Sequence, residues 1–116
     1  MKMLVGAAMF ALANVAGAHA AEMPRALIDN WCDTYNTGST TVYVKHHKKC
    51  RGDLVISKNN FGWEDTDCQP LTIDTTGKLE WMVTAKCKDY GADTVSTDQY
   101  KFKRLDNKLL VSETQQ

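Results

Sequence analysis

The chain has 116 residues and carries 14 basic and 14 acidic side chains, so its formal net charge at neutral pH is zero. This balance argues against a general nucleic-acid-binding protein, which has a strong excess of Lys and Arg. It also argues against a polybasic anchor on an anionic membrane. The length suits one domain with one hydrophobic core.

The N-terminus has the features of a secretory signal peptide, residues 1–20. Lys2 gives a positive start, the stretch that follows is mostly apolar, and the small residues Ala18 and Ala20 precede the expected cleavage point. The apolar stretch is shorter than the roughly 20 residues that a spanning helix needs, and no later segment qualifies. We therefore expect a periplasmic or secreted protein whose mature chain, 21–116, is a single domain without a membrane span.

A short helical turn is expected next, at 24–29, with Pro24 suited to its first position. Beyond it, apolar and polar residues alternate with the period of a β-strand. The clearest strand is 78–87, where Leu79 and every second residue after it up to Cys87 share one face. The other expected strands lie at 41–45, 53–57, 61–64, 71–73, 100–103 and 109–111.

Short strands separated by polar or glycine-bearing turns predict a mostly β protein. We expect a small antiparallel meander that forms a barrel or sandwich, with a short N-terminal helical turn and two disulfides. The chain has three tryptophans to place in a small interior, so we expect that interior to be filled. Trp31 and Trp81 are expected in the core, whereas Tyr35, Tyr43 and Tyr90 are expected at the surface.

The cysteines of an exported chain of this size indicate structural disulfides. No two of them form a C-x-x-C pair, the spacing that zinc sites and redox-active dithiols use. We therefore predict two disulfide bonds, and no metal or cofactor. The four cysteines are Cys32, Cys50, Cys68 and Cys87.

Two pairings find support in expected hairpins. Cys68 and Cys87 lie about equally far from the turn signal at 74–77, which favours their pairing and leaves Cys32 with Cys50. Cys50 and Cys68 are likewise equidistant from the polar turn at 58–60, which favours a Cys50–Cys68 bridge and leaves Cys32 with Cys87. The amphipathic strand before Cys87 favours the first pairing, and the second stays open.

Several of these features resemble a loose group of small, uncharacterised secreted proteins of proteobacteria. The shared patterns are W-C, C-x3-L-x-I, G-x-E-x3-C and V-x-A-x-C, which occur here at Trp31, Cys50, Gly62 and Val83. The segment 88–91 departs from the short acidic glycine turn of that group. The resemblance implies export and a disulfide-bonded β fold, and it implies no activity.

One basic run is the first candidate for a binding surface. It comprises Lys45, His46, His47, Lys48, Lys49 and Arg51, and it surrounds Cys50. Such a loop can dock an anion or a partner, with a charge that grows as histidine is protonated. The alternative is a solvated loop beside a disulfide. If the strand continues to the two histidines, they point to opposite faces and cannot easily bind one metal. If the chain turns at that point, both can be exposed.

The segment 58–67 is the second candidate, because Trp63 and Glu64 stand in an acidic stretch. Trp63 can stack on a sugar, but the more common role of such a residue is a core or rim aromatic. The acidic stretch lacks the spacing of a calcium-binding loop. No serine stands in a G-x-S-x-G sequence, so we predict no catalytic residue.

These observations favour a non-enzymatic binding module that recognises a protein partner in the cell envelope or the medium, and not nucleic acid. An inhibitor of a hydrolase is a specific version, with 45–51 or 58–67 as the segment that enters the cleft. The alternatives are a small-ligand carrier, which requires a cavity, and a structural or stress-related envelope protein. A hydrolase would require His46 or His47 beside a serine and a carboxylate.

Overall fold

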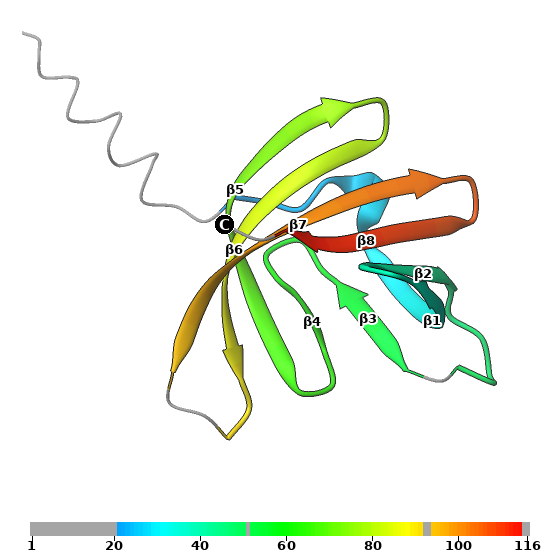
Figure 1. Ribbon diagram of the computed structural model, residues 1–116, viewed down its shortest axis with the longest axis horizontal. Helices are drawn as coiled ribbons and strands as arrows, with labels where there is room; N and C mark the ends of the chain where they lie inside the picture. The colour runs from blue at the N-terminus through cyan, green and yellow to red at the C-terminus, as the bar shows by residue number, and fades with distance from the viewer. Residues whose placement is uncertain (1–20, 51, 92–93, 115–116) are drawn as a thin grey trace, which may run out of the picture.

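The computed structural model describes residues 21–50, 52–91 and 94–114 as a closed antiparallel β-barrel preceded by one 3-10 turn (Figure 1). The expected signal peptide and Arg51 lie outside the described residues. The fold class predicted from the sequence is therefore confirmed as a barrel. Its elements are η1 (Arg25–Leu27), β1 (Asp29–Thr37), β2 (Thr40–Lys45), β3 (Asp53–Ile56), β4 (Phe61–Trp63), β5 (Thr66–Gly77), β6 (Glu80–Asp89), β7 (Val95–Leu105) and β8 (Lys108–Thr114).

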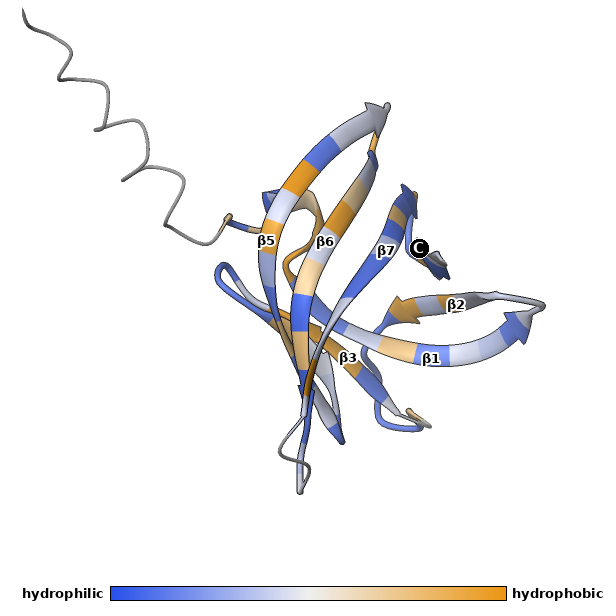
Figure 2. Ribbon diagram, turned by 60° about the vertical axis from the view of Figure 1, so that its left-hand side comes forward, coloured by the Kyte–Doolittle hydropathy of each residue, from blue (hydrophilic) through white to orange (hydrophobic). Residues whose placement is uncertain are grey.

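The alternation along the strands separates a buried face from a solvent face. Figure 2 shows hydrophobic and hydrophilic residues following one another along the ribbons. On β6, Val83 and Ala85 have no exposed surface, and the residue after Ala85 is exposed. The largest fully buried side chains are Trp31, Phe61 and Phe102, which fill the interior as expected.

The order of strands around the barrel departs from a simple meander at one point. Strands β3 to β8 follow one another as neighbours, and β8 closes the barrel against β2. However, β3 pairs with β1 and not with β2, its predecessor in the chain. The connection from β2 to β3 must therefore cross β1, and we call its described residues, 46–50 and 52, the crossing loop.

The strand β1 was not predicted, because its sequence after Cys32 is polar and shows no alternation. Trp31 faces the core and has no exposed surface, so Cys32 faces outward, under the crossing loop. The hairpin between β5 and β6 also differs from the prediction. Its turn lies at Lys78 and Leu79, and Leu79 has a positive φ of 54° and an exposed side chain, so it belongs to no strand face.

The 3-10 turn closes one end of the barrel, and it confirms the helical turn expected there. Pro24 precedes the turn as its N-cap residue instead of occupying its first position. Leu27 is fully buried, and its carbonyl accepts a hydrogen bond of 2.9 Å from the Trp31 indole. Arg104 stacks over the Trp31 ring at 5.5 Å and donates a 2.6 Å hydrogen bond to the carbonyl of Ala26.

We expect Arg104→Lys to lower the free energy of unfolding by about 1–2 kcal/mol, because lysine keeps the charge but loses the stacked guanidinium and its directed hydrogen bond. Arg25→Lys is the matched control, since Arg25 is exposed on the same closing turn. Urea unfolding of both variants measures the difference. Equal midpoints for the two would show that Arg104 does not hold the turn on the barrel.

The disulfides join Cys32 to Cys50 and Cys68 to Cys87, which confirms the first of the two pairings considered. The Cys68–Cys87 bond links directly opposed residues of β5 and β6 within the core cluster. In the part of the chain that the structure describes, no helix is long and apolar enough to cross a membrane. The two disulfides are compatible with a periplasmic or extracellular location.

Candidate functional site

The crossing loop begins where β2 ends, at Lys45. The Lys45 ammonium lies 3.3 Å from the carboxylate of Asp29, so it is committed to an ion pair on the barrel. His46 binds back across β1: its backbone N–H donates to the Asn30 carbonyl, and its Nδ1 lies 3.2 Å from Oδ1 of Asp53. The loop is thus held over β1 by contacts at both of its ends.

The strand ends before the two histidines, and their side chains make separate contacts within and beside the crossing loop. The His47 ring turns toward the disulfide, with Nε2 3.7 Å from the sulfur of Cys32, and its Nδ1 accepts the backbone N–H of Lys49. Among the described residues, one group of three potential ligand atoms lies close together, from Cys32, Cys50 and Asp53. Its two sulfurs are bonded to each other, so neither offers a thiolate to a metal.

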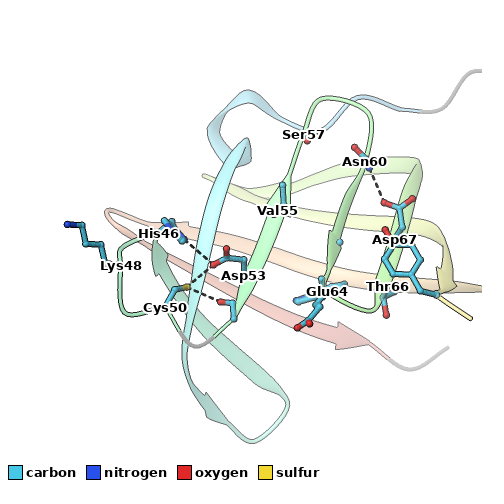
Figure 3. Close-up of a pocket in the computed structure, with 14 residues that line it drawn as sticks. His46, Lys48, Cys50, Asp53, Val55, Ser57, Asn60, Glu64, Thr66 and Asp67 are labelled. Carbon is cyan, nitrogen blue, oxygen red and sulfur yellow. Dashed lines mark hydrogen bonds and ion pairs between the residues drawn. The ribbon is translucent and has the colours of Figure 1, made fainter.

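A groove of about 580 Å³ runs along the outer face of β3 and β4 (Figure 3). Leu54 and Ile56 are buried, so Val55 between them points outward, and it forms part of the groove floor with 42% of its surface exposed. Gly62 lies opposite Val55 on β4 and adds no side chain to that floor. The floor is therefore shallow and partly apolar.

Both segments that the sequence singled out line this groove, although they are far apart in the chain. Figure 3 shows His46 and Lys48 on one side and Glu64 and Asp67 on the other. The loop wall therefore carries Lys48 and the His46–Asp53 pair, and the opposite wall is acidic. Of the remaining predicted residues, Lys45, His47 and Lys49 lie outside the groove lining, and Arg51 lies outside the described residues.

Trp63 lies where the groove meets the open end of the barrel, and it is half-buried. Its ring packs against those of Phe61 and Tyr100, at centroid distances of 6.0 and 5.5 Å, so it is a rim aromatic. Its indole N–H donates a 2.8 Å hydrogen bond to the hydroxyl of Tyr43. Two smaller depressions, of about 330 and 310 Å³, both border Trp63 and Tyr43.

Tyr43 is the residue of this site that sequence reasoning placed wrongly. It was expected at the surface, but only 4% of it is exposed and it belongs to the core cluster. Tyr35 and Tyr90 are exposed, as expected. In β2 the residues around Tyr43 are also apolar, so alternation alone does not assign the inward face. The facing of Tyr43 depends on the pairing of β2 with β1, in which Tyr43 lies opposite Asp33.

Two tyrosines near Trp63 are held in their neutral form. Burial raises the pKa of Tyr43, and the carboxylate of Asp33 raises it further. Burial also raises the pKa of Tyr100, with the negative charge of Glu113 as the next cause. Both phenols therefore favour the protonated state beyond the ordinary tyrosine pKa near 10.

We expect the free energy of unfolding to fall as the pH rises above about 10, because both phenols ionise near that pH in the unfolded chain and stay protonated in the barrel. The unfolded state then binds fewer protons, so alkaline pH favours unfolding. Tyr100→Phe should flatten this dependence, and the exposed Tyr35→Phe is the control. Denaturant unfolding between pH 8 and pH 11 provides the measurement. A Tyr100→Phe slope identical to that of the parent would contradict the assignment.

The groove contains a histidine, a carboxylate and a serine, the groups that a hydrolytic triad requires. His46 and Asp53 are paired, but Ser57 lies four residues beyond Asp53 along β3, which corresponds to roughly 13 Å in an extended strand. Figure 3 shows Ser57 at the far end of that strand. The Ser57 hydroxyl is therefore too distant to pass its proton to His46, so these three groups do not form a triad.

The sequence matches no protein-family model, and comparisons with curated proteins and with solved structures give no match. The function must therefore be argued from the geometry of the groove and the chemistry of its walls.

Proposed function

We propose that this protein is an exported, non-enzymatic binding module that recognises a protein partner through the groove between the crossing loop and the segment 58–67. The observation that carries the proposal is that this groove brings together residues of the basic run 45–51 and of the acidic stretch within 58–67, the two segments that the sequence singled out. A groove with Lys48 and the His46–Asp53 pair on one wall, carboxylates on the other and a partly apolar floor suits a polypeptide segment, which offers charges of both signs and apolar groups.

The rigidity of the walls supports this function. The crossing loop is tied to β1 by the Cys32–Cys50 bond and by the hydrogen bond from His46 to Asn30. The opposite wall is tied by Asn60, whose side-chain amide donates to Asp67 at 2.9 Å. Walls that are ordered before binding lose little conformational entropy when a partner binds. Inhibition of an extracellular hydrolase is the specific form of this proposal.

Export is part of the proposal. Its support is the pattern of residues 1–20, the two disulfides, and the resemblance to small secreted proteins of proteobacteria. A periplasmic and a fully secreted form are distinguished by fractionation: the processed protein, beginning at Ala21, is found either in the osmotic-shock fraction or in the culture medium.

The partner is sought by affinity capture from envelope and medium fractions, with oxidised 21–116 as bait and the reduced, alkylated chain as control. Two variants test the groove. Lys48→Glu reverses the charge of that side chain on the loop wall, and Val55→Lys places a longer, charged side chain on the groove floor. Lys86→Glu on the exposed face of β6 is the matched control. We expect one partner to be retained by the parent and by Lys86→Glu and lost by both groove variants. Retention by all four proteins would refute the groove assignment.

A small-ligand carrier is the second candidate, favoured by the two depressions beside Trp63 and Tyr43. Because large side chains fill the interior, a ligand would bind at the barrel mouth. Native mass spectrometry of protein purified from its own compartment tests this function. A bound small molecule that Trp63→Phe releases would favour the carrier over the module.

A further inference from the structure

The depression of about 330 Å³ at the open end of the barrel differs in chemistry from the groove beside it. We call it the mouth pocket. Its floor includes the hydrogen-bonded rings of Trp63 and Tyr43, and backbone is contributed by Gly52. Because Trp63 packs on Phe61 and Tyr100, its ring is held in one orientation before any ligand arrives.

Among the described residues, all the charged side chains that line the mouth pocket are acidic. They are Asp33, Asp53, Glu64 and Asp65. Lys48 and His46 of the neighbouring wall line the groove and not this pocket. Asp53 is paired with His46, whereas Asp33, Glu64 and Asp65 form no ion pair with any residue that the structure describes.

The negative charge reaches the aromatic floor. Asp33 lies directly opposite Tyr43 in the register of β1 and β2, and its charge adds to the effect of burial in raising the pKa of that phenol. A cation that entered the pocket would lie between these carboxylates and the face of an aromatic ring. Both interactions are attractive.

We infer that the mouth pocket receives an arginine side chain of the protein partner. A guanidinium is planar, so it can stack on the Trp63 ring while its N–H groups donate to carboxylates at the edge. The pocket adjoins the groove through Gly52, Asp53, Trp63 and Glu64, which line both. A segment lying in the groove can thus place one side chain in the pocket. The inference deepens the proposed function, on which it rests for the source of the arginine.

The pocket is tested on oxidised 21–116 with two small probes, N-acetyl-arginine amide and its uncharged analogue N-acetyl-citrulline amide. NMR titration follows the indole N–H resonance of Trp63. We expect the arginine probe to shift this resonance saturably and the citrulline probe to bind at least about ten-fold more weakly, the difference expected from loss of one charge-assisted contact. The corresponding lysine probe distinguishes a guanidinium site from a general cation site.

The variants Asp33→Asn and Asp65→Asn remove charge from the mouth pocket without changing size, and neither residue lines the groove. Asp74→Asn, exposed on β5, removes the same charge elsewhere. We expect the two pocket variants to weaken arginine binding and Asp74→Asn to leave it unchanged. Equal binding of the arginine and citrulline probes, or equal loss in all three variants, would overturn the inference.

The capture experiment separates this inference from the proposed function. A partner that is lost by Lys48→Glu but bound normally by Asp33→Asn and Asp65→Asn would leave the function standing and refute the arginine pocket. The reverse outcome is that the arginine probe binds the pocket but the protein captures no partner. In that case the pocket would be a site for a free cation, and the binding module would be refuted.

Discussion

Gly62→Ala is expected to destabilise the barrel by about 1–3 kcal/mol, the range for forcing extra atoms into a packed site. A Cβ at this position would clash with the backbone oxygen of Thr66 and lie 3.1 Å from Cα of Asp67. These are backbone atoms, so they cannot move away as the end of a side chain can. Strand β4 has only three residues and pairs with β3 on one side and β5 on the other, so a shift at Gly62 disturbs both ladders.

Gly52→Ala is the control for this effect, because a Cβ at Gly52 meets nothing within 4 Å. We expect its stability to lie within about 0.5 kcal/mol of the parent, as for most surface substitutions. Guanidinium unfolding of the two variants at equal protein concentration measures the contrast. Similar midpoints would mean that β4 and β5 can separate at Gly62 without cost, and that the flat groove floor is not imposed by this glycine.

The parts of the fold that the sequence predicted are those in which alternation is strict. In β6, inward Val83 and Ala85 alternate with polar neighbours, and the face assigned from the sequence is the buried one. In β1 the only large apolar residue is Trp31, so the strand has no pattern to detect. Its existence depends on pairing with β2 and β3, which are distant contacts that local sequence does not encode.

The sequence predicted the two segments of the candidate site, but it did not predict that they meet in one groove. Charge concentration identified the two segments that form the groove walls, because charged runs are visible in a linear sequence. Their meeting in one groove depends on the crossing loop, which follows from β3 pairing with β1. The mouth pocket was not predicted. Asp33 and Asp65 stand in unremarkable polar contexts, and only the register of Asp33 with Tyr43 and the turn after Trp63 bring their carboxylates together.

The two disulfides are expected to contribute similarly to stability and differently to binding. Their sequence separations are 18 and 19 residues. In the chain-entropy account, loops of these lengths each stabilise the fold by about 3 kcal/mol. We therefore expect Cys32→Ala/Cys50→Ala and Cys68→Ala/Cys87→Ala to lower the free energy of unfolding by comparable amounts through loop entropy. The second variant loses some additional stability, because its sulfurs are packed in the core cluster.

The difference lies in what each bond holds in place. Cys68 and Cys87 sit within the long β5–β6 ladder, whose hydrogen bonds keep the strands together after the bond is removed. In Cys32→Ala/Cys50→Ala the sulfur that His47 contacts is also removed. Among the described residues, the crossing loop then keeps its contacts to the barrel at His46 and Gly52. We expect amide hydrogen exchange to accelerate at His46 and Lys49 in Cys32→Ala/Cys50→Ala alone, and partner binding to be lost in that variant alone. Both variants lose stability, so a loss of binding in one variant alone cannot result from lower stability. Loop amides that stay protected in both variants would show that the Cys32–Cys50 bond does not shape the groove.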